Sequence, residues 1–171
     1  MIFGFAHREG FKREHQMHPL GHGQSAWRKF WIFLGLVVLI GFVLNEIWEM
    51  AQMSAYVETK NAPWVDSLAL CTRAALGDVV IILGLYAAGA LAAADPAWGL
   101  RARWNIYLVT SLIGLGVAVL IEHAALEDGR WTYSANMPVV PFLKAGLWPI
   151  LQMILLPPAT FWIARRVVAN H

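Results

Sequence analysis

The sequence is poor in charged residues and contains a single cysteine. Asp, Glu, Lys and Arg together make up 14% of the 171 residues, against about 25% in soluble domains. A soluble chain of this length would have too little polar material to cover its apolar residues. Cys71 alone excludes an internal disulfide and the zinc sites that are built on cysteine pairs. The composition therefore favours a membrane protein.

A strong net charge and a signal peptide are also missing. The formal net charge is +2, and the basic residues do not gather on one periodic face, so we expect no nucleic-acid partner. Residues 1–29 carry charges and histidines where a cleaved signal peptide has an apolar stretch. We expect them to remain as a polar cytoplasmic tail. His15, His18 and His22 have helical spacing, but Pro19 disfavours a helix there, so metal binding by the tail is only an open alternative.

Long apolar stretches dominate the rest of the chain. A hydrocarbon core of about 30 Å requires roughly 20 helical residues, and each stretch reaches that length. The short alternating segments of a membrane barrel are not found. The sequence predicts an all-α polytopic membrane protein with one four-helix transmembrane domain over residues 30–166. The expected helices are residues 30–55, 68–94, 104–126 and 142–164.

The distribution of Lys and Arg predicts the orientation. Nine of them fall on the side of the chain ends and four on the other side, which favours N-in and C-in by the positive-inside rule. We therefore expect a multi-pass protein of a bacterial inner (plasma) membrane. Tryptophans near the helix ends suit aromatic belts at both interfaces. These are Trp27, Trp31, Trp98, Trp104 and Trp162 on the inner side, and Trp64, Trp131 and Trp148 on the outer side.

Polar residues within the apolar stretches converge at one depth, in the outer half of the expected bundle. At 1.5 Å per residue, Glu46 and Glu49 lie roughly 24 and 28 Å along the first helix, and Glu122 lies roughly 27 Å along the third. Some of these residues share a helical stripe with their neighbours. The polar set consists of Asn45, Glu46, Glu49, Gln52, Cys71, Asp78, Glu122, His123 and Gln152.

Asp78 is the strongest candidate for a functional group. A carboxylate below the membrane boundary costs about 2.5–3.5 kcal/mol on insertion scales, so such a residue is usually paired, protonated or functional. We expect Asp78 to face the bundle interior within hydrogen-bonding reach of at least one of Glu49, Glu122, His123 or Gln152. Arg73 is the alternative partner. Glu46, Glu49 and Glu122 could instead extend to the lipid headgroups, where a charge costs little.

Two further features concern helix packing and the loops. Ser111, Gly114, Ala118 and Glu122 form a face of small residues on the third helix that would allow close packing. Pro157 and Pro158 should kink or break the fourth helix and free carbonyl groups that must find other partners. The connection over residues 127–138 is rich in aromatic residues and is expected to lie over the polar cluster, either as a site element or as an interfacial anchor.

Some motifs resemble known membrane families. Trp131-Thr132-Tyr133-Ser134, Met137-Pro138 and Gly146-Leu147-Trp148-Pro149 are similar to a family of small bacterial four-helix inner-membrane proteins, and the likeness covers most of residues 45–160. This resemblance implies a fold and no activity. Glu122 followed by Gly129-Arg130-Trp131-Thr132-Tyr133 also resembles the small membrane lycopene cyclases. The paired Pro-Glu motifs of those cyclases are missing here.

Three functions remain open at this stage. The first is acid-catalysed modification of an isoprenoid-like membrane lipid, with Asp78, Glu122 and Glu49 as catalytic groups. The second is binding or transport of a proton or metal ion, although the sequence lacks a complete metal-ligand motif and indicates no cofactor. The third is a non-catalytic subunit or assembly factor with a membrane-protein partner or a second copy of itself. The expected substrate-binding residues are Glu46, Gln52, His123, Trp131, Tyr133, Trp148 and Gln152.

Overall fold

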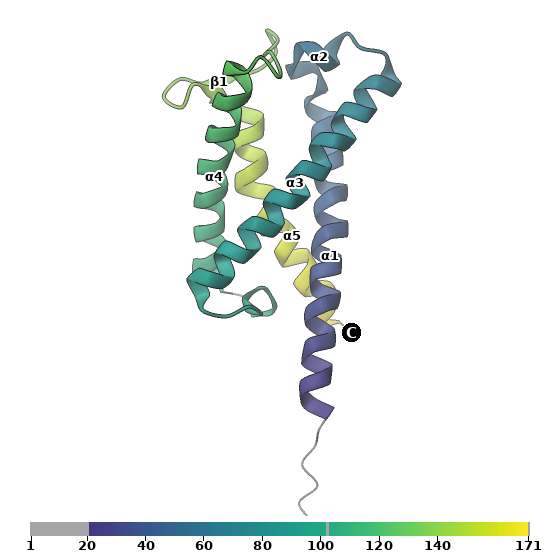
Figure 1. Cartoon of the computed structure of the whole chain (residues 1–171), viewed down its shortest axis with the longest axis vertical. Coiled ribbons are helices and arrows are strands. Elements are labelled where there is room, and N and C mark those ends of the chain that lie inside the picture. The colour runs from purple at the N-terminus through teal and green to yellow at the C-terminus, as the bar shows by residue number, and fades with distance from the viewer. Residues whose placement is uncertain (1–20, 102, 171) are drawn as a thin grey trace, which may run out of the picture.

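Four long helices form a bundle in the computed structural model, which describes residues 21–101 and 103–170 (Figure 1). They are α1 (Gly21–Gln52), α3 (Trp64–Ala93), α4 (Trp104–Glu127) and α5 (Leu147–Ala169). All four are long and apolar enough to cross a membrane, in agreement with the predicted all-α polytopic fold. α1 packs against α3 and α5, and α4 packs against the same two helices, so α1 and α4 are diagonally opposite.

Short elements connect the long helices. The turn η1 (Met53–Ala55) and the helix α2 (Val57–Lys60) follow α1, and the turn η2 (Trp98–Leu100) joins α3 to α4. Between α4 and α5, strand β1 (Val139–Val140) pairs antiparallel with β2 (Ala145–Gly146), with Val139 opposite Gly146. Figure 1 shows α2 and β1 at one end of the bundle, whereas the start of α1 and the C-terminal end of α5 lie toward the other.

Several helix boundaries differ from the sequence prediction. α3 begins at Trp64 instead of residue 68, and α5 ends at Ala169 instead of residue 164. α1 begins at Gly21 instead of residue 30, so part of the expected polar tail continues the helix, which extends past the rest of the bundle in Figure 1. α5 begins at Leu147 instead of residue 142, because the residues before it form the β1–β2 hairpin. Phe142 lies in its turn and is 97% exposed. The tail residues His15 and His18 and the side chain of His22 lie outside the described part of the structure.

The two prolines do not end α5, which contains both Pro157 and Pro158. The ribbon of α5 bends midway along its length (Figure 1). Because a proline has no N–H, Pro158 leaves the carbonyl of Ile154 without its usual helical donor, and the Ser111 hydroxyl of α4 donates to that oxygen at 3.1 Å. The small-residue face of α4, which the sequence predicted to allow close packing, thus packs against the proline-containing part of α5.

Close packing of α4 on α5 also depends on Gly114. A Cβ atom at this position would collide with the carbonyl oxygen of Met153, which is backbone of α5. Met153 is four residues before Pro157, so its carbonyl is the second one that the prolines leave without a helical donor. The missing side chain of Gly114 therefore lets the two helix backbones approach each other where α5 is irregular.

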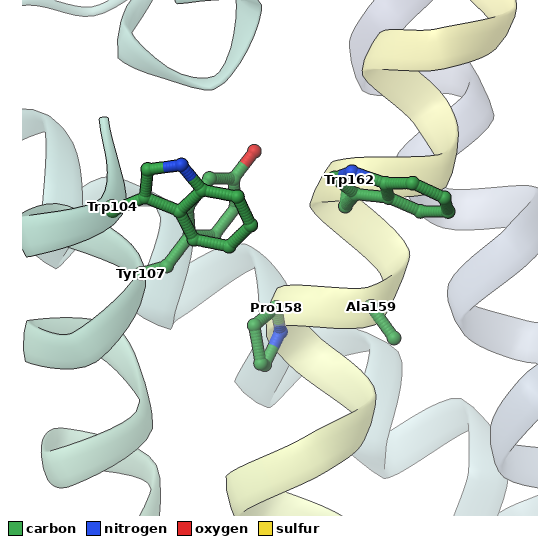
Figure 2. Close-up of a pocket in the computed structure, with 5 residues that line it drawn as sticks. All are labelled: Trp104, Tyr107, Pro158, Ala159 and Trp162. Atoms are coloured by element: carbon green, nitrogen blue, oxygen red, sulfur yellow. The ribbon is translucent and has the colours of Figure 1, made fainter. Parts of the chain in front are cut away.

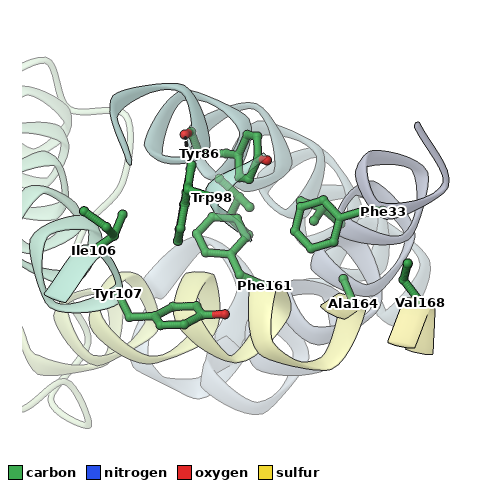
Figure 3. Packing of buried hydrophobic residues seen from close by; sticks show 10 residues of the cluster. Phe33, Tyr86, Trp98, Ile106, Tyr107, Phe161, Ala164 and Val168 are labelled. Atoms are coloured by element: carbon green, nitrogen blue, oxygen red, sulfur yellow. Dashed lines mark hydrogen bonds between the residues drawn. The ribbon is translucent and has the colours of Figure 1, made fainter. Parts of the chain in front are cut away.

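An aromatic core fills the end of the bundle near η2. Trp98 is fully buried among Tyr86, Tyr107 and Phe161 (Figure 3), and its indole N–H donates to the Tyr86 carbonyl at 3.0 Å. The assignment of Trp98 to an interfacial belt was therefore wrong. The connection carrying it folds back into the bundle, where Gly89 makes room: a Cβ there would lie 2.7 Å from the Trp98 ring.

Candidate functional site

The side-chain amide of Gln152 joins three helices at the end of the bundle opposite the aromatic core. Its nitrogen Nε2, on α5, lies 3.0 Å from Oδ1 of Asn45 and 2.9 Å from Oε1 of Glu49, both on α1, and 2.8 Å from Oδ2 of Asp78 on α3. A primary amide has only two hydrogens. Gln152 therefore cannot donate to all three oxygens at once, and one of them depends on a second donor.

Neighbouring amides hold this arrangement in place. The amide nitrogen of Gln52 donates to Oε1 of Glu49 at 2.9 Å and to Oε1 of Gln152 at 3.2 Å. The amide nitrogen of Asn45 donates to the carbonyl of Gly41 at 2.7 Å. This hydrogen bond orients the amide oxygen of Asn45 toward Gln152. Gln52 is 6% exposed, and its Oε1 has no hydrogen-bond partner among the described residues. A buried acceptor is therefore available next to the carboxyl pair.

Glu122 supplies a third carboxyl group, from α4. It is 2% exposed and accepts a hydrogen bond from the hydroxyl of Tyr133. The Tyr133 oxygen in turn accepts a hydrogen bond from the backbone N–H of Gly146 at 2.7 Å. Burial, together with the hydrogen bond to Glu122, raises the pKa of the Tyr133 phenol. Tyr133 therefore stays protonated and remains a donor to Glu122 at neutral pH.

The connection after α4 covers the polar cluster, as the sequence suggested. Its backbone pairs with the segment after α1: Val57 N–H donates to the carbonyl of Thr132 at 3.0 Å, and Ser134 N–H donates to the carbonyl of Ala55 at 2.9 Å. Side chains add to this contact, because the Tyr56 ring packs against Trp131 and Tyr133 with centroids 6.2 and 5.9 Å apart. Two loops far apart in sequence thus close this end of the bundle.

A cavity of about 680 Å³ opens beside the cluster, within the range of about 300–1,000 Å³ that is common for small-molecule sites. Glu49, Asp78 and Glu122 contribute acidic groups, and Gln52 and Gln152 contribute amides. Arg73, Arg130 and Glu58 also line the cavity and are exposed. Apolar and aromatic side chains form much of the remaining wall, including Met53, Tyr56, Leu70, Cys71, Ala74, Ile81, Ala118, Ile121, Trp131, Pro149 and Met153.

Most of the predicted site residues meet in this cavity. Its lining includes the expected catalytic carboxyls and, from the expected substrate-binding set, Gln52, Trp131 and Gln152. Tyr133 contacts the cavity indirectly, through its hydrogen bond to Glu122. The predicted contact of Asp78 is confirmed by its hydrogen bond with Gln152. Arg73 forms no ion pair with Asp78 within the described part of the chain.

Three predicted residues lie elsewhere. Glu46 accepts a hydrogen bond from the Thr72 hydroxyl at 3.0 Å, a contact between α1 and α3, and it does not line the cavity. His123 Nε2 donates to the carbonyl of Leu143 at 2.7 Å and so ties α4 to the hairpin. Trp148 is exposed and also lies outside the cavity lining. These three side chains have other contacts or face the surroundings, and none of them lines the cavity.

Several residues that line the cavity were not in the predicted set, among them Tyr56, Arg73 and Arg130. Tyr56 lies on the same helical stripe as Glu49 and Gln52, so the helical periodicity already indicated it. Arg73 and Arg130 line the cavity, but charge alone did not separate them from other arginines near the interface. The described residues contain no group of three or more His, Cys, Asp or Glu side chains that could hold a metal ion.

Comparison with protein-family models, curated proteins and solved structures finds no match for this chain.

Proposed function

We propose that the chain is a membrane enzyme that catalyses an acid-dependent rearrangement of an isoprenoid-like lipid bound in the cavity. One observation carries the proposal: the carboxyl groups of Glu49 and Asp78 share the amide of Gln152 at the wall of a cavity that is otherwise largely apolar. Such a cavity accepts an apolar molecule, and the carboxyl pair offers it a proton. The lycopene-cyclase resemblance of Glu122 and residues 129–133 points to the same class of reaction.

The proposed proton rests on the proximity of two carboxyl groups. Glu49 and Asp78 both lie within hydrogen-bond distance of the same Gln152 nitrogen. A proton shared by Glu49 and Asp78 avoids two adjacent negative charges in a weakly polar environment. A carboxylic acid in that state can act as a general acid. Glu122, which lines the same cavity from α4, is available as the base that later removes a proton.

The proposed reaction needs no further reactant. The acid adds its proton to one carbon of a C=C bond, and the positive charge develops on the other carbon. Loss of a proton from an adjacent carbon to a carboxylate then gives a double-bond isomer. For a ring-closed product, a second C=C bond of the same lipid first attacks the cation and forms the ring C–C bond, and the new cation then loses a proton to the carboxylate. Neither route is a net oxidation. The aromatic rings of Tyr56 and Trp131 at the cavity wall can stabilise the cation by about 2 kcal/mol in a dry site.

Lipid analysis tests the proposal directly. In extracts from cells that lack the gene, we expect one isoprenoid-like lipid to accumulate and a product of equal mass but different chromatographic retention to disappear. Re-expression of the chain should restore the product. An unchanged lipid and pigment profile would contradict catalysis. In that case proton or cation binding by the same carboxyl pair becomes the better explanation.

The orientation of the chain is part of the proposal. The excess of Lys and Arg near the chain ends supports N-in and C-in in a bacterial inner membrane, with the cavity toward the outer face. In a Cys71→Ala background, Arg28→Cys should react with a membrane-impermeant thiol reagent only in inverted vesicles. Asn136→Cys, in the connection after α4, should react only in intact spheroplasts. Both side chains are exposed.

Labelling of both cysteines from one side would contradict an odd number of spans between them, and therefore the crossing of the membrane by all three intervening helices, α1, α3 and α4. The reverse pattern, with Arg28→Cys labelled from outside, would contradict the N-in orientation alone.

A further inference from the structure

A second hollow lies between α4 and α5 at the end of the bundle that holds the aromatic core. Its volume is about 230 Å³, and its walls are formed by Trp104, Tyr107, Pro158, Ala159 and Trp162. Figure 2 shows Trp104 and Tyr107 on one side and Trp162 on the other, with Pro158 between them. Trp104 is 71% exposed and Trp162 is 40% exposed. The hollow is therefore an apolar groove that opens to the surroundings of the bundle.

Two unused hydrogen-bond donors lie close together here, one on Tyr107 in the wall of the groove and one on the neighbouring Arg165. Tyr107 is 5% exposed, yet neither its hydroxyl nor Nε of Arg165 has a hydrogen-bond partner among the described residues. The Arg165 guanidinium lies next to the Tyr107 hydroxyl. Buried polar groups without partners are uncommon, since each costs about 1–3 kcal/mol. Two adjacent donors without an acceptor match an anionic ligand.

The charges at this end of the bundle also favour an anion. Arg166 lies over the ring of Trp162, 5.0 Å from its centroid, and so stands at the edge of the groove. Asp95 is the acidic residue of the described chain at this end, and Arg101 already pairs with it at 3.0 Å. Arg103 donates to the carbonyl of Ala93 at 3.3 Å. Arg165 and Arg166 have no acidic partner among the described residues, so their positive charges are available to a ligand.

We propose that this groove binds an anionic phospholipid, with one acyl chain against Pro158 and Ala159 and the phosphate at Tyr107 and Arg165. The depth fits a lipid headgroup, because Tyr107 is about one helical turn from the start of α4 and Arg165 about one turn from the end of α5. Basic pockets between spanning helices commonly hold such headgroups. The apolar walls favour a lipid over free phosphate. This site is independent of the cavity that contains Asp78.

Binding to the purified full-length chain in detergent tests the inference. Native mass spectrometry should show retention of phosphatidylglycerol at least about 10-fold stronger than of phosphatidylcholine with the same acyl chains. Inorganic phosphate at the same concentration should not compete. Tyr107→Phe and Arg165→Gln should each weaken phosphatidylglycerol binding by about 10-fold, the size expected for a hydrogen bond to a charged group.

Matched variants separate the site from general effects of charge. Lys60→Gln removes a positive charge at the opposite end of the bundle and should leave binding unchanged. Ala159→Trp fills the groove and should reduce binding even if Arg165→Gln proves too unstable to purify. Equal retention of the two phospholipids, competition by free phosphate, or full binding by both Tyr107→Phe and Ala159→Trp would overturn the proposal.

Discussion

Replacing Asp78 with asparagine should lower the rate of the proposed reaction by at least about 100-fold, while the chain still inserts and folds. The amide keeps the size of the carboxyl group and can still accept a hydrogen bond from Gln152. It has no proton that it can give to a C=C bond, and positioned acids contribute about 100- to 10,000-fold to such reactions. The measurement is conversion, in isolated membranes, of the lipid that accumulates in cells without the gene.

Asp66→Asn is the matched control for this variant. Asp66 lies in the first turn of the same helix, α3, and is exposed, so its replacement should leave the rate unchanged. Full activity of Asp78→Asn would show that the carboxyl cluster only holds the helices together, because amides make comparable interhelical hydrogen bonds. If Asp78→Asn fails to fold, Glu49→Gln provides the same test from α1.

Replacing Gly114 with leucine should cause the largest loss of stability among single changes in α4, about 3 kcal/mol or more. The added side chain would meet the carbonyl oxygen of Met153. Because that oxygen belongs to the backbone of α5, the two helices must move apart, and such overpacking is costly. Separation would also break the hydrogen bond from Ser111 to Ile154. Unfolding in detergent micelles, followed by circular dichroism, measures the effect.

Gly116→Leu is the control for the effect of a leucine in this helix. Gly116 is exposed, and a Cβ atom there would meet nothing within 4 Å. Its replacement should change the free energy of unfolding by less than about 0.5 kcal/mol. Equal stability of the two variants would mean that α4 and α5 do not approach each other closely at Gly114.

The sequence predicted the features that depend on helix length and helical periodicity. Apolar stretches of more than about 20 residues indicated the four helices. Counting 1.5 Å per residue brought Glu49, Asp78, Glu122 and Gln152 to one depth, and the structure places all four at one cavity. The expectation that the prolines of α5 would need outside hydrogen-bond donors was met by Ser111.

Features that depend on the rotation of one helix against another were not accessible from sequence. Glu46 and Glu49 lie on one helix at almost the same depth, yet Glu46 contacts Thr72 whereas Glu49 contacts Gln152. The apolar residues before Leu147 read equally well as helix or hairpin, because hydropathy carries no information on backbone pairing. Likewise, the burial of Trp98 requires its connection to fold back between helices that are distant in sequence.

The aromatic core around Trp98 has a consequence for permeation. The cavity with its carboxyl groups occupies one end of the bundle, and at the other end Phe33, Trp98 and Phe161 are each 0% exposed and close the interior. An ion that entered the cavity would meet these apolar rings on its way across, and a charge is costly in such surroundings. In this conformation the packing favours a molecule that arrives and leaves by one side over one that must pass across.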